Sequence, residues 1–174
     1  MENIVLKSME ERRSIRSYQS RQVEEDKLQA ILRAGTYAAT GRGLQSPIMI
    51  VVQDKDVREQ LRRMNATIMG NPDMDPFYGA PTIIIVLADR AVSTCVEDGS
   101  VVMANLMNAA YAVGVDSCWI HRAREEFESE EGKALLAKLG IEGDYIGVGH
   151  CILGYRKGDY PTARPRKENY IYRV

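Results

Sequence analysis

Arginine and hydroxyl side chains gather in residues 11–18, where the sequence reads ERRSIRSY. Arginine offers a rigid fork of N–H donors that matches phosphate oxygens, and serine adds a short neutral donor. Because Arg12, Ser14 and Arg16 alternate, their side chains share one face if the backbone is extended. A second basic cluster, RPRK, occupies residues 164–167. If the two clusters meet in space they form a site suited to a dianionic phosphate; otherwise they are solvated surface charge.

The composition of the chain is that of an ordinary soluble globular protein. It has 174 residues, of which 45% are hydrophobic and 27% charged, and its formal net charge is -1. This length suits one domain spanning residues 1–174. The near-neutral charge argues against nucleic acid as the main partner, because binding to a phosphate backbone usually needs a large basic excess. Local arginine clusters in such a chain favour a small anionic ligand.

Neither a secretory signal nor a membrane anchor is evident in the sequence. The N-terminus is polar and acidic, and the longest uncharged run, residues 99–115, is short for a bilayer span. Cys95, Cys118 and Cys151 are odd in number and form no CxxC pair, which disfavours a disulfide framework or a zinc site. We therefore expect a cytoplasmic protein without membrane contact, whose cysteines pack in the core.

Hydrophobic spacing predicts helices that alternate with short strands. We expect helices over residues 3–11, 23–39, 54–69, 98–113 and 128–139, and strands over 47–52, 82–87, 117–120 and 145–153. The continuous apolar run of 82–87 predicts a strand covered on both faces. The helix 98–113 is apolar almost all round, so it lies deep or in an interface. By itself this pattern indicates an α/β domain with four or five core strands, and we expect the tail from Arg156 onward to pack on another surface.

Other catalytic patterns find little support. The GxG sequences at 41–43 and 147–149 lack the strand–turn–helix context of a dinucleotide site. His121 and His150 have no metal-ligand spacing, and no serine lies in a GxSxG elbow. We expect His150 to pack in the core, whereas His121, at the end of a strand, is better placed for a ligand. The absence of acid–base residues is typical of an enzyme whose chemistry is carried by a bound organic cofactor.

Six segments, taken in order, carry a resemblance to a known family. They are RRSIR at 12–16, AATGRGLQSP at 38–47, YGAPT at 78–82, GVDSCWI at 114–120, LGY at 153–155 and RPRK at 164–167. In their order and spacing the chain resembles the FMN-dependent nitroreductase superfamily over almost its whole length. The resemblance implies an α+β fold, with a mostly antiparallel central sheet of about four to five strands flanked by helices. It also implies an intertwined homodimer with FMN bound at the subunit interface.

The same resemblance assigns residues to the cofactor by position. The phosphate and ribityl chain would be held by residues of both basic clusters, namely Arg12, Arg13, Ser14, Arg16, Arg164 and Arg166. The loop by which the partner subunit reaches the flavin would contribute Thr40, Gly43 and Gln45. Gly43 stands where many members of the family have an asparagine that contacts the flavin.

Four further residues are assigned to the neighbourhood of the flavin ring. His121 and Arg122 occupy the segment that passes near the isoalloxazine, Gly154 would let the backbone approach the cofactor, and Asn65 would make a polar contact with the ring edge. The resemblance implies no catalytic side chain and no metal.

The function implied is a two-step flavin cycle. NAD(P)H would transfer hydride to FMN and depart, and an electron-poor acceptor such as a nitroaromatic or a quinone would then be reduced at the same face. Two alternatives remain open at this point. One is a flavin-binding or flavin-storing protein without NAD(P)H turnover, and the other is a different flavin reaction on the same fold, such as azoline dehydrogenation or dehalogenation.

Overall fold

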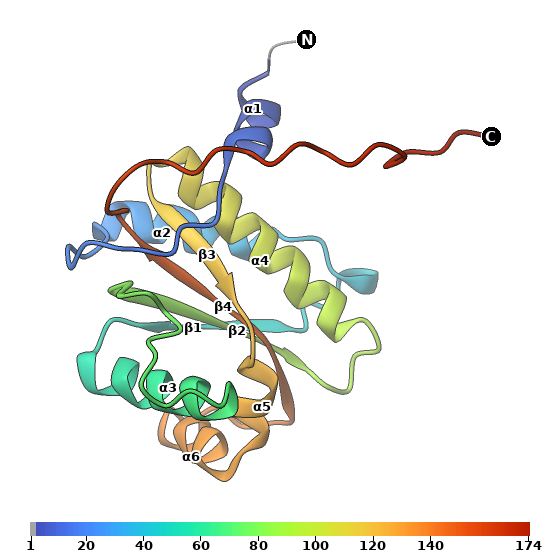
Figure 1. Cartoon of the computed structure of the whole chain (residues 1–174). Helices are drawn as coiled ribbons and strands as arrows, with labels where there is room; N and C mark the ends of the chain where they lie inside the picture. Colours follow the sequence, from blue (N-terminus) through green and yellow to red (C-terminus); the bar gives the residue numbers. More distant parts are fainter. Residues whose placement is uncertain (1–2) are drawn as a thin grey trace.

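The computed structural model describes residues 3–174, and in that range strands and helices follow one another along the chain (Figure 1). Their bounds are α1 (Ile4–Glu11), α2 (Glu25–Thr36), the short 3-10 helix η1 (Gly41–Gly43), β1 (Pro47–Val52), α3 (Lys55–Ile68), β2 (Thr82–Asp89), α4 (Cys95–Ala112), β3 (Asp116–Ile120), α5 (Ala123–Glu128), α6 (Glu130–Lys138) and β4 (Tyr145–Gly154). In the described part of the chain, no helix is both long enough and apolar enough to cross a membrane.

The four strands form one sheet in the order β1-β2-β4-β3, and every neighbouring pair is antiparallel. The helix–strand pattern alone indicated an α/β domain, and that prediction is wrong, because the sheet contains no parallel pair of named strands within residues 3–174. The α+β fold with an antiparallel sheet, implied by the family resemblance, is confirmed. β3 is an edge strand, so one of its sides is open to other segments.

Helices cover both faces of the sheet. Along β2, Ile83 and Ile85 point into one apolar cluster, with α3, α5 and α6, whereas Ile84 and Val86 point into the other, with α2 and α4. Burial on both faces explains the continuous apolar run of β2, as predicted. Gly99 lets α4 lie close against β4, because a Cβ at this position would clash with the side chain of Val148.

The predicted helix 128–139 is confirmed as α6, but the short helix α5 that directly precedes it was not predicted. Ser129 has an extended backbone (ψ 158°), and its hydroxyl accepts a hydrogen bond from the Gly132 N–H, which caps α6. The break is tight, since a Cβ on Gly132 would overlap the carbonyl oxygen of Glu126. Helix α5 escaped prediction because it has only six residues and too short an apolar pattern.

The segment between α1 and α2 runs along the open edge of β3. Ser14 forms a parallel bridge with Ser117, and the Ile15 N–H donates to the Ser117 carbonyl at 3.0 Å. Ile15 and Tyr18 are buried in the core, whereas Arg16 and Ser17 between them are exposed. This docking holds residues 12–18 in the extended form that the alternation of arginine and serine requires.

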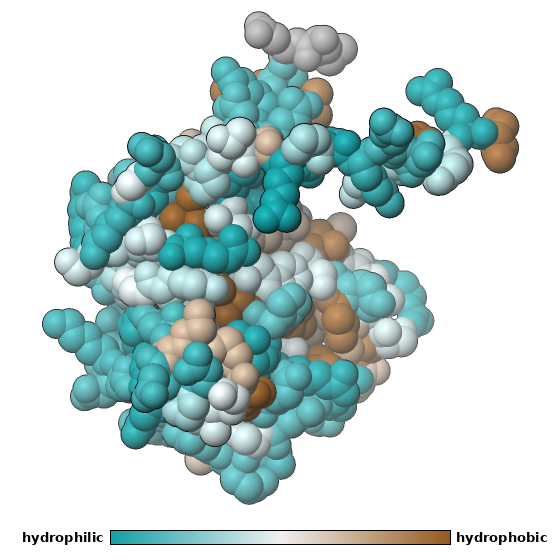
Figure 2. Space-filling view, viewed as in Figure 1, coloured by the Kyte–Doolittle hydropathy of each residue, from teal (hydrophilic) through white to brown (hydrophobic). Residues whose placement is uncertain are grey.

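The tail from Arg156 onward, which we expected to pack on another surface, does so only in its first part, where Tyr160 packs against the core. Figure 2 shows the end of the tail standing clear of the rest of the molecule, with apolar atoms near that end. Tyr170, Ile171 and Tyr172 are 69–82% exposed. Within one chain, therefore, no surface covers this apolar end among residues 3–174.

Candidate functional site

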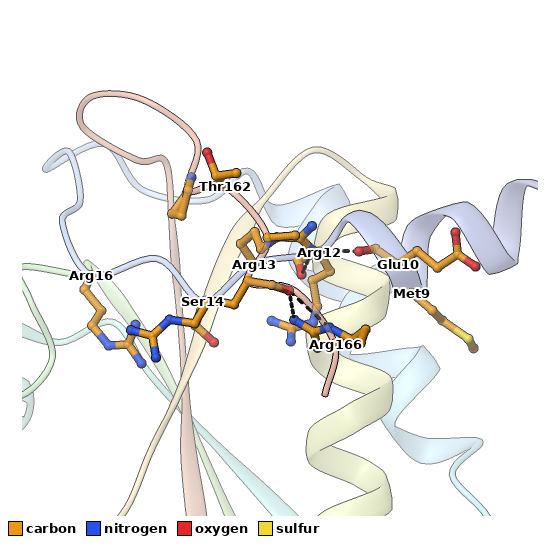
Figure 3. Close-up of a pocket in the computed structure, with 11 residues that line it drawn as sticks. Met9, Glu10, Arg12, Arg13, Ser14, Arg16, Thr162 and Arg166 are labelled. Atoms are coloured by element: carbon orange, nitrogen blue, oxygen red, sulfur yellow. Dashed lines mark hydrogen bonds between the residues drawn. The ribbon is translucent and has the colours of Figure 1, made fainter. Parts of the chain in front are cut away.

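A cavity of about 960 Å³ lies between the end of α1, the segment 12–16 and the tail (Figure 3). Its walls carry the side chains of both basic clusters and a few neighbours, namely Met9, Glu10, Arg12, Arg13, Ser14, Arg16, Pro161, Thr162, Ala163, Arg164 and Arg166. Five of these lining residues are arginines and one is a carboxylate. The fold thus brings together two clusters that are about 150 residues apart in the sequence.

Arg12 gives the clearest indication that this cavity is suited to an anion. Its Nη1 is buried and has no hydrogen-bond partner within residues 3–174, and the same holds for Nε of Arg13. A buried donor without an acceptor is costly, and the cost is larger for a charged group. Arg16 lies on the same wall and is exposed to solvent. Oxygens of an anionic ligand would satisfy the Arg12 donor.

Arg13 and Tyr160 tie the walls of the cavity to each other. Arg13 Nη1 donates to the carbonyl oxygens of Glu10 at 2.6 Å and of Arg12 at 2.9 Å, which fixes the turn after α1. The Tyr160 hydroxyl accepts from the Arg13 N–H at 2.8 Å and donates to the Glu11 carbonyl at 3.1 Å. Tyr160 therefore holds the start of the tail against the arginine segment, a role that no motif in the sequence indicated.

Thr40, Gly43 and Gln45 lie outside this cavity in the same chain. Their loop precedes β1, and its backbone is left-handed at Arg42 (φ 53°), Gly43 (φ 69°) and Gln45 (φ 51°). The Thr40 hydroxyl accepts from the Gln45 N–H at 3.1 Å. A single chain does not bring this loop to the two basic clusters.

Buried Asp98 of α4 anchors this loop. Its carboxylate accepts hydrogen bonds from the Gly41 N–H and the Ser46 hydroxyl, each at 2.8 Å, and from the Thr94 hydroxyl at 3.3 Å. Burial raises the pKa of Asp98, but these three hydrogen bonds together outweigh burial and hold the pKa below its ordinary value. The strained turn around Gly43 is therefore a fixed feature of the fold.

Asn65, His121 and Arg122 lie together at the other end of β3 from Ser117. Asn65 is fully buried, and its Nδ2 donates to the His121 carbonyl oxygen at 2.9 Å. Its Oδ1 accepts from Nε of Arg122 at 2.8 Å. The His121 side chain is exposed, and Arg122 is half-buried in a left-handed conformation (φ 78°). The sequence-assigned ring residues are thus neighbours, with Asn65 behind the other two.

Gly154 is buried at the end of β4, and the chain's own side chains occupy the space beside it. A Cβ at this position would lie 2.9 Å from Pro81 Cδ and 3.0 Å from Tyr18 Cδ1. The absence of a side chain at Gly154 therefore leaves the space that Tyr18 and Pro81 occupy.

The sequence model of the nitroreductase family matches residues 9–155. The chain belongs to the nitroreductase family. It is 33% identical over 159 residues to a protein of Archaeoglobus fulgidus provisionally named NADH dehydrogenase/NAD(P)H nitroreductase, which covers 88% of this chain and 86% of the relative.

Solved nitroreductases with bound FMN share the fold. That of Bacteroides fragilis superposes with a TM-score of 0.90 at 28% identity, covering 99% of this chain and 100% of the other. That of Desulfitobacterium hafniense gives a TM-score of 0.87 at 25% identity and 99% coverage of both chains. The family match ends before Arg164 and Arg166, so the position of these two arginines is known from the structure of the chain.

Two buried titratable residues of this nitroreductase-family chain lie next to each other, and one of them contacts Asn65. His150 of β4 is fully buried, as predicted, against the ring of Phe77. Glu126 of α5 is also fully buried, and no sequence pattern indicated it because its short helix escaped prediction. Cys118 and Cys151 are buried too, and burial raises the pKa of both thiols, in agreement with their predicted role in the core.

Proposed function

We propose that this chain binds FMN and acts as an FMN-dependent oxidoreductase. The observation that carries the proposal is the arginine-lined cavity in which a buried donor of Arg12 has no partner within residues 3–174. The donor set fits a phosphate monoester dianion, since guanidinium groups bind phosphate oxygens in pairs. Relatives of the same fold with bound FMN support this choice of ligand.

In this proposal residues of both basic clusters hold the phosphate and the ribityl chain. They are Arg12, Arg13, Ser14 and Arg16, together with Arg164 and Arg166. From Ser117, beside Ser14, strand β3 leads to His121 over about 13 Å, at roughly 3.3 Å per residue. His121 and Arg122 would accordingly stand at the ring end of the site.

When bound, FMN supplies a ring that takes up hydride from NAD(P)H and passes electrons to an electron-poor acceptor, for which we propose nitroaromatics and quinones. The protein's own share is binding and electrostatics. The arginine wall neutralises the phosphate, and the cation of Arg122 favours negative charge near its end of the site. No side chain in this proposal acts as a nucleophile.

We further propose that a second copy of the chain completes the site. Thr40, Gly43 and Gln45 lie away from the basic cavity of their own chain, so they would reach the flavin of the partner subunit. Helix α1 exposes Ile4 (77%), Leu6 and Met9, and the tail exposes its aromatic end. These apolar surfaces are suited to a homodimer interface.

The first test is the visible absorption of the protein purified without added cofactor, followed by identification of any released chromophore. We expect FMN at about one per chain, reduced rapidly by NADH or NADPH without oxygen, and a dimer in sedimentation. A protein that neither carries nor takes up FMN would contradict the cofactor. FMN that dithionite reduces quickly but NAD(P)H does not would favour the storage alternative over the enzyme.

A further inference from the structure

A group of buried polar side chains from α3, α5 and β4 lies behind Arg122. Asn65 Nδ2 donates to Oε1 of Glu126 as well as to the His121 carbonyl. On the other side of the carboxylate, His150 Nε2 lies 3.2 Å from Glu126 Oε2, but the two atoms form no hydrogen bond, and neither has another partner among residues 3–174. Asn65, Glu126 and His150 are each 0% exposed. Four polar groups of different elements therefore converge on one point at the end of β3.

The Glu126 carboxylate and the His121 carbonyl together decide which way the Asn65 amide is turned. A carboxylate and a carbonyl can only accept, so both must face the NH₂ group of Asn65. The Asn65 oxygen is then left to face Arg122, whose Nε donates to it at 2.8 Å. Reversal of the amide would place its oxygen against Glu126 and the His121 carbonyl. The orientation that holds Arg122 is thus fixed from inside the core.

Arg122 keeps free donors on its outer side. Among residues 3–174, Nε is its one hydrogen-bonded guanidinium nitrogen and it has no ion pair, and its terminal nitrogens are not among the buried unpaired atoms. The residue itself adopts a left-handed backbone, a costly choice for arginine. An oriented cation with open donors is suited to hold a negative charge.

Stability alone does not account for this arrangement. A buried carboxylate must lose its water, and replacement of a buried ionic group by apolar residues is often neutral or stabilising. Helix α5 has only six residues, and it nevertheless turns Glu126 into the core between Ala123 and Phe127, which are buried too. A positioning role explains why a charged group is used there.

We infer that Asn65 and Glu126 are positioning residues that hold the Arg122 guanidinium at the ring end of the site, where its charge makes the protein bind reduced flavin more tightly than oxidised flavin. The inference rests on the proposed function, because it needs FMN in the site. It assigns a task to the buried residue Glu126, which the proposed function does not use.

The test is the ratio of affinities for reduced and oxidised FMN. The affinity for oxidised FMN comes from quenching of flavin fluorescence, and the midpoint potentials of bound and free FMN give the ratio without any measurement of turnover. Arg122→Gln removes the cation, and Asn65→Leu removes its support at similar volume. We expect each to lower the preference for reduced flavin about tenfold, the effect of one charge-assisted hydrogen bond.

The decisive result comes from the double variant. If Asn65 acts through Arg122, Asn65→Leu changes the ratio by less than about twofold once Arg122→Gln is present. Equal effects of Asn65→Leu in both backgrounds, or no effect in either, would overturn the inference. Glu128→Gln is the matched control, because Glu128 lies on α5 like Glu126 but is exposed and pairs with Arg90 and Arg124. The ratio of affinities must stay unchanged in this variant.

If Asn65→Leu does not fold, Glu126→Gln takes its place at unchanged side-chain size. Its effect on the ratio must differ between the wild-type and Arg122→Gln backgrounds, and equality would overturn the inference. Failure of the proposed function looks different, since the wild-type protein itself would then not bind FMN. If the protein binds FMN but the ratio of affinities for reduced and oxidised FMN does not respond to these substitutions, only the positioning role is contradicted.

Discussion

Replacement of Arg12 by alanine separates a ligand-binding arginine from a structural one. In the free chain Arg12 Nη1 is buried without a partner in the described range, so its removal takes away an unsatisfied donor and no hydrogen bond of that nitrogen. We expect the free energy of unfolding without FMN to stay the same or to rise slightly. The affinity for FMN should fall, because the phosphate loses a charged donor.

The size of the loss follows from the kind of hydrogen bond involved. A hydrogen bond to a charged group contributes about 1.5–3 kcal/mol, which corresponds to roughly a 10- to 150-fold increase in Kd. The melting temperature should show the same contrast between the apoprotein, which the substitution does not destabilise, and the FMN-bound protein, which it destabilises. FMN at a fixed excess stabilises the folded chain less in the variant than in the wild type, since the gain depends on the ratio of ligand concentration to Kd.

The assay is titration of apoprotein with FMN, followed by flavin fluorescence, beside urea unfolding of the apoproteins. Arg33→Ala serves as the control, because Arg33 is an exposed arginine in the last turn of α2 and does not line the cavity. Unchanged FMN affinity in Arg12→Ala would refute the anion site. An equal loss of apoprotein stability and FMN affinity would instead make Arg12 a structural residue.

Three further predictions concern the supports of the site. Asp98→Asn should cost about 1.5–3 kcal/mol at neutral pH, the scale of a hydrogen bond to a charged group. Because the pKa of Asp98 is held below its ordinary value, this contribution is complete above the ordinary pKa and is lost as the pH falls below about 4. Urea unfolding of both proteins across pH 2–7 checks it, and a constant difference would contradict it. Tyr160→Phe should weaken FMN binding roughly two- to tenfold by freeing the tail, the effect of a neutral hydrogen bond, with little change in melting temperature. If the tail does not contact FMN, the FMN titration of Tyr160→Phe will match that of the wild type. Gly132→Ala should destabilise the fold by about 1–3 kcal/mol, because its Cβ has no room beside the Glu126 carbonyl. Ala137→Gly, at an exposed position of the same helix, is its control, with an expected loss of about 1 kcal/mol or less in the free energy of unfolding. A Gly132→Ala variant as stable as the wild type would show that the break between α5 and α6 can relax.

The residue types and their spacing were enough to predict the parts of the site that are local in sequence. Alternation of Arg12, Ser14 and Arg16 predicts a shared face on an extended segment, and the segment is extended. The apolar run of β2 predicts burial on both faces, which the two clusters confirm. Such patterns can be recognised in the sequence because side-chain direction repeats every two residues on a strand.

Strand direction and helix breaks needed the tertiary structure. The same apolar strand suits a parallel or an antiparallel sheet, and only the pairing with β1 and β4 decides between them. The break at Ser129 depends on contact between Gly132 and the Glu126 carbonyl, which no periodicity records.

The site itself was decided by contacts between residues far apart in the chain. Arg12 meets Arg166 because residues 12–18 dock on the open edge of β3 and Tyr160 holds the tail beside them. Asn65 reaches Arg122 because α3 packs against α5, whose first turn directly follows Arg122. The sequence by itself determined which donors the chain has and which of them can share a face, whereas the free energy of packing two distant segments together decided which donors meet.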